Sequence, residues 1–376
     1  MWKSIFTRKE VKKLYSVRKN SKLISAFLLI AAILSGLVNI VPAESKNVIA
    51  ASSLSEKQVI LCGTPFGIRL FTSGVVVVGT ADIQTNDGTV NPPAKSGIQV
   101  GDIVTGVNGK EVNSNEEVSE AIRKSGGQVV QLSLLREGKA FTAALQPVAS
   151  PAGYRAGLWV RDSTAGIGTL TFYDPDTKIF AGLGHGICDP DTNELMPLLS
   201  GDVVPVTISG IRKGVQGTAG ELQGYFASDT AIGTLSQNGT CGVFGSLREN
   251  PQGQTISVMS GDEVHAGPVK ILSTIDQNGP KAYDACIEFV NGHGGNSKNI
   301  VIKITDSGLL EKTGGIVQGM SGSPILQDGK LAGAVTHVFV NDPTRGYGIL
   351  AVNMISADSQ NQETFAGSLL PAVRIL

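Results

Sequence analysis

The stretch GMSGSPILQDGKLAGAVTHV, residues 319–338, decides how the rest of the sequence is interpreted. Its first part surrounds Ser321 with small residues, which permit a tight loop from which a hydroxyl projects outward. The backbone N–H groups of Gly319 and Ser321 could then converge on the oxyanion that develops during acyl transfer. The second part places apolar runs on either side of an Asp-Gly turn, which is typical of a β-hairpin. The stretch predicts a nucleophilic serine in a β-rich domain.

The loop around Ser321 is similar to the Gly-Asp-Ser-Gly-Gly-Pro loop of chymotrypsin-like proteases, and the strand after it resembles their substrate-pairing strand. A G-x-S-x-G elbow of the α/β-hydrolase type does not occur, because Ser323 stands where its last glycine would be. Residues 152–376 show short apolar segments between Gly, Asn-Gly and Asp-Pro turns, with little helical periodicity. We expect a mainly β domain there, with the double β-barrel of the chymotrypsin type.

A serine nucleophile needs a general base, and the chain has four histidines: His185, His265, His293 and His337. His185 is the preferred base because it follows a predicted strand within Gly-Leu-Gly-His-Gly, where glycines leave room for substrate. His337 is its main competitor because its strand should border the cleft. Two acids could orient the base. Spacing favours Asp229, 44 residues after His185, over Asp306, 15 residues before Ser321.

Residues 59–147 are predicted to form a small α+β domain. Ser114 and Glu117 form a capping box that begins a helix, and β-branched runs flank it. The segment PAKSGIQVGDIVTGVNGKEV, residues 93–112, resembles a bacterial PDZ domain. Four residues stand at the position of that family's carboxylate-binding loop: Pro65, Phe66, Gly67 and Ile68. We expect backbone N–H groups near Gly67 to hold a peptide carboxylate, with Phe66 and Ile68 beside its last side chain.

The formal net charge of −1 conceals a division of charge along the chain. Of 31 bases and 32 acids, residues 1–22 hold eight bases and one acid, which leaves 23 bases and 31 acids elsewhere. Residues 23–43 carry no charge, and 21 helical residues span about 30 Å of hydrocarbon. We expect a cytoplasmic basic segment, a transmembrane anchor and an exported acidic body. A cleaved signal peptide ending near Val41-Pro42-Ala43 is the alternative.

Residues 44–58 are polar with small side chains and are predicted to be a linker exposed to proteolysis. The basic segment is interpreted as orienting the chain in a membrane, and no nucleic-acid partner is expected. The four cysteines have no metal-ligand spacing, so we expect neither a metal site nor a cofactor. They are expected to be buried free thiols, although export would also permit a disulfide: Cys62, Cys188, Cys241 and Cys286.

The whole arrangement resembles the stage IV B sporulation serine peptidases of endospore-forming bacteria. The likeness is strongest over residues 303–349 and is supported by residues 166–187. It implies that His185, Asp306 and Ser321 form the catalytic triad, which places Asp306 above Asp229. It further implies an exported peptidase that cleaves itself near the linker and then cleaves a membrane-bound regulator. That activity would lie between the two membranes of the developing spore and would lead to processing of a sigma-factor precursor.

Overall fold

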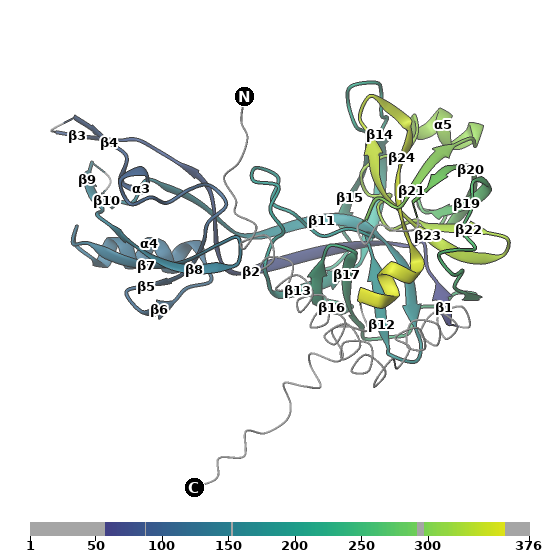
Figure 1. Cartoon of the computed structure of the whole chain (residues 1–376), viewed down its shortest axis with the longest axis horizontal. Coiled ribbons are helices and arrows are strands. Elements are labelled where there is room, and N and C mark those ends of the chain that lie inside the picture. Colours follow the sequence, from purple (N-terminus) through teal and green to yellow (C-terminus); the bar gives the residue numbers. More distant parts are fainter. Residues whose placement is uncertain (1–56, 87, 152, 292–296, 358–376) are drawn as a thin grey trace, which may run out of the picture. The chain divides into compact units, whose positions relative to one another are not determined.

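The computed structural model describes residues 57–86, 88–151, 153–291 and 297–357 (Figure 1). The predicted basic segment (1–22), the predicted anchor (23–43) and all but the last two residues of the predicted linker (44–58) lie outside this part of the chain. In the described ranges, no helix is both long enough and apolar enough to cross a membrane.

Six antiparallel strands close into a first barrel. In spatial order they are β2 (Pro65–Thr80), β11 (Leu158–Asp174), β12 (Ile179–Gly182), β17 (Gly242–Leu247), β16 (Gly233–Gly239) and β13 (Leu198–Val204), and β13 returns to β2. Alternate side chains point inward and pack into one apolar core. In that core the rings of Phe66 and Phe180 meet edge to face, with centroids 5.8 Å apart. Two short strands, β1 (Gln58–Leu61) and β18 (Thr255–Ser257), continue the sheet beyond β11.

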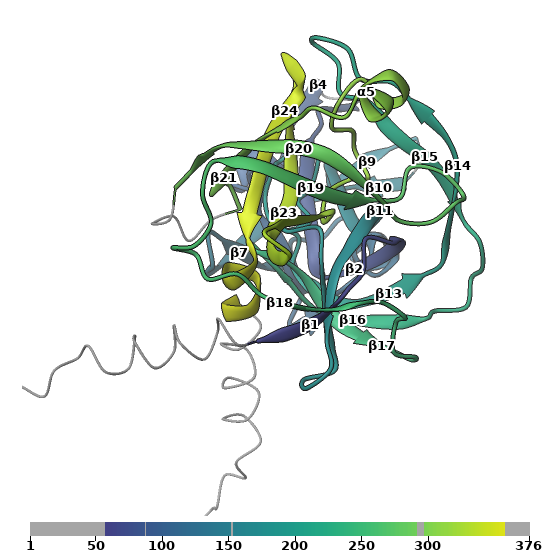
Figure 2. The same cartoon turned by 90° about the vertical axis from the view of Figure 1, so that its right-hand side faces the viewer.

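A second closed barrel follows along the chain (Figure 2). Its strands, in spatial order, are β19 (Gly267–Ser273), β20 (Lys281–Val290), β21 (Ile300–Ile304), β24 (Asp342–Leu350), β23 (Lys330–Phe339) and β22 (Pro324–Gln327). Strands β22 and β23 form the hairpin predicted around the Asp-Gly turn. Helix α5 (Ser307–Thr313) and the ribbon of β14 (Val206–Arg212) with β15 (Glu221–Phe226) complete this region.

The module for which the sequence predicts a PDZ domain lies between β2 and β11 in the sequence. Its elements are β3 (Ile83–Thr85), β4 (Gly88–Val90), α3 (Pro92–Lys95), β5 (Ile103–Val107), β6 (Lys110–Glu111), α4 (Asn115–Lys124), β7 (Val130–Arg136), β8 (Lys139–Leu145), β9 (Val148–Ser150) and β10 (Gly153–Arg155). The predicted helix start is confirmed, because the Ser114 hydroxyl accepts the N–H of Glu117 at 3.2 Å. The Glu117 carboxylate reaches back one residue further than a capping box requires, to the N–H of Asn113.

Strands β2 and β11 run through both the PDZ module and the first barrel. They pair from Thr80 with Leu158 at one end to Pro65 with Thr169 at the other. The register shifts between Arg161 and Ser163, which marks the passage from one part to the other. The module is therefore inserted between two barrel strands, and residues 58–72 belong to the sheet of the first barrel. This differs from the predicted division at residues 147–152, whereas the predicted mainly β architecture with two six-stranded barrels is confirmed.

Candidate active site

The loop that carries Ser321 depends on two glycines with left-handed backbone angles. Gly319 has φ of 96° and Gly322 has φ of 94°. A Cβ atom on Gly322 would overlap the carbonyl oxygen of Thr169. Thr169 in β11 holds the loop, since its hydroxyl donates to the Gly319 carbonyl at 2.8 Å and its N–H donates to the Ser321 carbonyl at 2.9 Å. The small residues of the motif therefore let the loop press against the first barrel.

The predicted oxyanion donors lie beside the same cavity as the nucleophile. Gly319 and Ser321 both line this cavity. The peptide unit that carries the Gly319 N–H is held through the Gln318 carbonyl, which accepts the N–H of Leu222 at 2.8 Å. The unit that carries the Ser321 N–H is held through the Met320 carbonyl, which accepts the N–H of Ser323 at 2.9 Å. Among the described residues, neither N–H group donates a hydrogen bond, so both remain available as the predicted oxyanion hole requires.

The hydroxyl of Ser321 donates a hydrogen bond to the backbone carbonyl of Thr336 in β23, at 2.6 Å. The acceptor belongs to the strand that the sequence predicted to lie beside the cleft. In this orientation the hydroxyl proton of Ser321 points at a carbonyl oxygen, which is too weak a base to remove it. Attack on a peptide bond therefore needs the hydroxyl to turn from Thr336 to an imidazole.

His185 follows β12 through two residues with positive φ, Leu183 at 63° and Gly184 at 70°. A Cβ atom on Gly184 would lie 2.9 Å from the methyl group of Thr336, so this glycine permits the two barrels to approach closely. The Nδ1 atom of His185 is 2.8 Å from the carbonyl oxygen of Gly186. Burial lowers the pKa of His185, which favours the neutral imidazole that a general base needs.

His337 lies beside His185, with ring centroids 4.6 Å apart and planes inclined by 38°. Burial lowers the pKa of His337 to about 4, with a further contribution from the repulsion that a protonated His337 would meet from the Lys298 ammonium and from a protonated His185. Its Nδ1 atom is buried without a hydrogen-bond partner in the described part of the chain. The predicted base and its main competitor are thus neighbours in one site.

A cavity of about 550 Å³ contains these groups and opens between the two barrels. His185, Ser321 and His337 share it with apolar side chains from both barrels, among them Ile167, Val317 and Val338. A cavity with a nucleophile, a neutral imidazole and apolar walls suits the extended chain of a peptide substrate.

Asp306 is not brought to His185 in this arrangement. Its carboxylate begins helix α5, where Oδ1 accepts the N–H of Leu309 at 2.8 Å and Oδ2 accepts the N–H of Asp284 at 3.3 Å. The bond from Leu309, with help from Asp284, lowers the pKa of Asp306. Asp306 does not line the cavity that holds Ser321. The expected contact between this carboxylate and the base is therefore absent from the structure.

Asp229, the acid that spacing favoured, is almost fully exposed and lies 3.5 Å from the guanidinium of Arg69. Across the described ranges, neither His185 nor His337 forms a hydrogen bond or an ion pair with a carboxylate. The hydrogen bond that His185 does make goes to a backbone carbonyl. The serine and the two imidazoles that the sequence predicted thus share one cavity, but the structure does not bring either predicted acid to them.

The prediction of a carboxylate-binding loop at Pro65, Phe66, Gly67 and Ile68 is wrong. Ile68 and Gly67 pair with β11 on one edge and with Val203 and Val204 of β13 on the other. Phe66 is fully buried in the barrel core. With both strand edges used, the backbone N–H groups of this segment cannot converge on a ligand. Ile68 instead contributes to the wall of the Ser321 cavity.

The cysteines are four free thiols in different environments. Cys62 and Cys241 are buried as expected, Cys286 is partly buried, and Cys188 is exposed, contrary to expectation. Burial raises the pKa of Cys62 to about 12, so its thiol is unreactive near neutral pH. In the described residues, no cluster of three or more potential metal ligands occurs.

Two protein-family models match this chain. The family described as SpoIVB peptidase S55 matches residues 152–355, and the PDZ domain family matches residues 68–146. Among solved structures, the chain is similar to the inactive form of Rv3671c from M. tuberculosis H37Rv, crystallised as a serine-to-alanine mutant. That similarity has 13% sequence identity and a TM-score of 0.29, and it covers 55% of this chain and 84% of the other. Because the peptidase match spans more than half of the sequence and includes Ser321 and His185, the chain belongs to the SpoIVB peptidase S55 family and is a serine peptidase with an inserted PDZ domain.

Proposed function

We propose that this chain is an exported, membrane-anchored serine endopeptidase that acts in sporulation signalling. It cleaves itself in the linker at residues 44–58 and is thereby released from its anchor at residues 23–43. It then cleaves a membrane-bound regulatory protein in the space between the two membranes of the developing spore. The family membership supports the signalling role, and the charge division of the sequence supports export of the acidic body.

The observation that carries the proposed chemistry is the meeting of Ser321 and His185 in one cavity between the barrels. A substrate chain lies along the cavity, and the Ser321 hydroxyl turns from Thr336 toward His185. His185 accepts the hydroxyl proton as the oxygen attacks the peptide carbonyl. The N–H groups of Gly319 and Ser321 hold the resulting oxyanion.

Collapse of this intermediate breaks the C–N bond, and His185 gives its proton to the departing amine. Water then attacks the acyl ester on Ser321, again with His185 as the base, and releases the carboxylic product. Both imidazoles are kept neutral by burial, so the base is available near neutral pH. In this mechanism the orientation of His185 is supplied by its bond to the Gly186 carbonyl and by the adjacent ring of His337.

Release from membranes tests the proposal most directly. The full chain is produced in cells, and membrane and soluble fractions are followed over time with an antibody against the protease part. We expect a shortened soluble product whose new N-terminus lies within residues 44–58. Ser321→Ala should remain full-length and membrane-bound, whereas Ser307→Ala, at an exposed serine on α5, should behave as wild type. Equal release of the Ser321→Ala chain would overturn self-cleavage.

The regulatory substrate needs a separate measurement. Membranes from sporulating cells are incubated with the released wild-type product or with its Ser321→Ala form, and new protein N-termini are identified by mass spectrometry. We expect cleavage of one membrane-bound protein, or very few. Broad degradation of unfolded proteins such as casein would instead indicate a quality-control protease.

A further inference from the structure

The imidazole of His185 is held by a backbone carbonyl and not by an acidic side chain. Its Nδ1 atom lies 2.8 Å from the carbonyl oxygen of Gly186. A carbonyl oxygen carries no proton, so a hydrogen bond between these two atoms requires the proton on Nδ1. In the neutral ring the lone pair is then on Nε2, where it can accept the proton of a serine hydroxyl. The Gly186 carbonyl thus selects the tautomer in which His185 can act as a base.

The peptide unit that contains this carbonyl is fixed from its other side by Asn238. The N–H of Ile187 belongs to the same peptide unit, and it donates to Oδ1 of Asn238 at 2.7 Å. A trans peptide unit is planar and its N–H and carbonyl point in opposite directions, so a fixed N–H also fixes the carbonyl. One series of contacts therefore runs from the Asn238 amide, through the backbone, to the Nδ1–H of His185.

The nitrogen of the Asn238 amide is also hydrogen-bonded. Nδ2 donates to the carbonyl of Ile187 at 2.8 Å and to the carbonyl of Met196 at 2.9 Å. With an N–H on one side and two carbonyls on the other, only one orientation of the amide satisfies all three bonds. Asparagine supplies the acceptor and both donor hydrogens on one planar group, so its orientation here is well defined.

A bulge in β16 directs Asn238 toward this site. The register of β16 against β17 shifts within residues 235–237, and beyond the shift Asn238 pairs with Val243. Paired residues of antiparallel strands have their side chains on the same face, and Val243 faces the core of the first barrel. The extra residue thus turns Asn238 inward at the end of its strand. A Cβ atom on Gly186 would lie 2.9 Å from the Gly239 carbonyl oxygen, so Gly186 permits the close approach.

We propose that Asn238 is a positioning residue of the peptidase. It orients the peptide unit between Gly186 and Ile187, and the carbonyl of this unit takes the place that a carboxylate has in a Ser-His-Asp triad. Within the residues that the structure describes, no carboxylate pairs with His185, and the Gly186 carbonyl holds its Nδ1 atom. The inference rests on the proposed role of His185 as the general base and adds the side chain that orients it.

The kinetic test follows the rate at which a fluorophosphonate probe labels Ser321 in the full chain, over a range of probe concentrations. Such a series separates the affinity for the probe from the rate constant of the reaction. For Asn238→Ala we expect the rate constant to fall by about 10- to about 100-fold with unchanged affinity, because the base loses its orientation. An unchanged rate constant would overturn the proposal.

A second variant separates orientation of the base from simple clamping of the loop. Asn238→Asp keeps an acceptor for the N–H of Ile187 in either protonation state, but it loses donor bonds to the carbonyls of Ile187 and Met196. If the bond to the Ile187 N–H carries the effect, this variant should label within about threefold of the wild-type rate. Labelling as slow as that of Asn238→Ala, at an equal folded fraction, would assign the effect to clamping and overturn the proposal.

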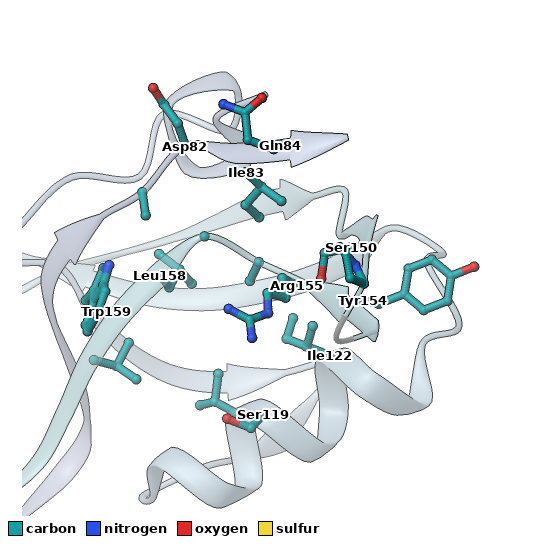
Figure 3. Close-up of a pocket in the computed structure, with 16 residues that line it drawn as sticks. Asp82, Ile83, Gln84, Ser119, Ile122, Ser150, Tyr154, Arg155, Leu158 and Trp159 are labelled. Atoms are coloured by element: carbon teal, nitrogen blue, oxygen red, sulfur yellow. The ribbon is translucent and has the colours of Figure 1, made fainter. Parts of the chain in front are cut away.

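Asn113→Ala is the matched control. Oδ1 of Asn113 also accepts a backbone N–H at 2.7 Å, that of Gly74. Asn113 lies just before helix α4, which lines a separate cavity of about 590 Å³ in the PDZ module (Figure 3). That cavity shares no lining residue with the Ser321 cavity. Asn113→Ala should therefore lose a comparable hydrogen bond and keep the wild-type rate of labelling.

Nuclear magnetic resonance reads the tautomer of His185 without any need for activity. The full chain with Ser321→Ala, labelled with ¹⁵N-histidine, contains four histidines, and the signal lost on His185→Gln identifies the base. We expect His185 to carry its proton on Nδ1, and adding Asn238→Ala should remove most of this form. A proton on Nε2 in the presence of Asn238, or an unchanged tautomer after its replacement, would overturn the proposal.

The measurements also separate this inference from the proposed function. Should Asn238→Ala fail to fold, the tautomer in the chain that retains Asn238 and the labelling rate of Asn238→Asp still decide the outcome. Failure of labelling in every sample, wild type included, would count against the peptidase mechanism itself. In that case the histidine spectrum still tests whether Asn238 orients the ring of His185.

Discussion

The Ser321 hydroxyl donates its hydrogen bond to the Thr336 carbonyl at 2.6 Å and not to an imidazole. The nucleophile and the strand expected to pair with substrate are therefore bonded to each other. A substrate chain that pairs with β23 would compete for this carbonyl, which would free the hydroxyl to turn toward His185. Substrate binding and nucleophile activation are in this way linked by one backbone oxygen.

The loop geometry predicts different effects for two glycine-to-alanine changes. Gly322→Ala should abolish fluorophosphonate labelling, because the added Cβ overlaps the Thr169 carbonyl and displaces Ser321. Gly329→Ala is the matched control. It also has positive φ, at 77°, but a Cβ there meets nothing within 4 Å. Gly329→Ala should cost only about 1–2 kcal/mol of stability and keep its activity. Full labelling of the Gly322→Ala chain would contradict the observed contact.

Asp306 should tolerate asparagine better than alanine if its role is to begin α5. Asparagine can still accept the N–H of Leu309, whereas alanine cannot, and loss of an N-cap costs about 0.5–2 kcal/mol. The melting temperature and the self-cleavage of Asp306→Asn should therefore be close to those of wild type. Asp306→Ala should unfold at a lower temperature. Loss of self-cleavage in a normally stable Asp306→Asn chain would restore the catalytic role that the family resemblance implies.

The histidine pair predicts how stability depends on pH. Burial places the pKa of His337 at about 4, below the ordinary histidine value of 6.5, and also lowers the pKa of His185. The unfolded chain then binds more protons between about pH 4 and 6.5, so stability falls as pH decreases through that window. His337→Gln should show a weaker fall of Tm over the same window, and we expect the two chains to differ by a few degrees. Parallel Tm curves would show that His337 titrates normally.

The acid limb of the activity profile follows from the same burial. The base must be neutral, and the pKa of His185 is lowered, so labelling of Ser321 should remain fast below pH 6.5. The measurement is the labelling rate between pH 4.5 and 8 over a range where circular dichroism shows the chain to be folded. A midpoint at or above 6.5 would indicate that a carboxylate pairs with His185 during the reaction.

Cys188 should be the thiol through which alkylation inhibits the enzyme. It is exposed and lines the Ser321 cavity, whereas Cys62 is buried with a pKa of about 12. At pH 8, N-ethylmaleimide should modify Cys188 before Cys62, although burial and Glu194 raise the pKa of Cys188 and slow the reaction. Labelling of Ser321 should fall as Cys188 is modified, and Cys188→Ser should be protected. Equal inhibition of Cys188→Ser would place the effect elsewhere.

Local sequence patterns predicted the catalytic loop, the segment around His185 and the start of helix α4. Each depends on a few adjacent residues: glycines that permit positive φ, a serine that caps a helix, and turn residues between apolar runs. The two-barrel architecture was predicted from the short apolar segments that alternate with turn residues, and from family resemblance. The meeting of His185 with His337 was only partly foreseen, because the residues are 152 positions apart and no local pattern records their distance.

The sequence by itself thus determined the candidate nucleophile, the candidate bases and the kinds of domain, because short-range sterics and hydrogen bonding specify such features locally. Only the tertiary structure decided that Pro65–Ile68 is barrel wall, that Asp306 caps a helix, and that the PDZ module is inserted between β2 and β11. These outcomes rest on strand pairs as far apart as Pro65 and Thr169. Which of several available partners such a strand or carboxylate takes is settled by the packing of the whole chain.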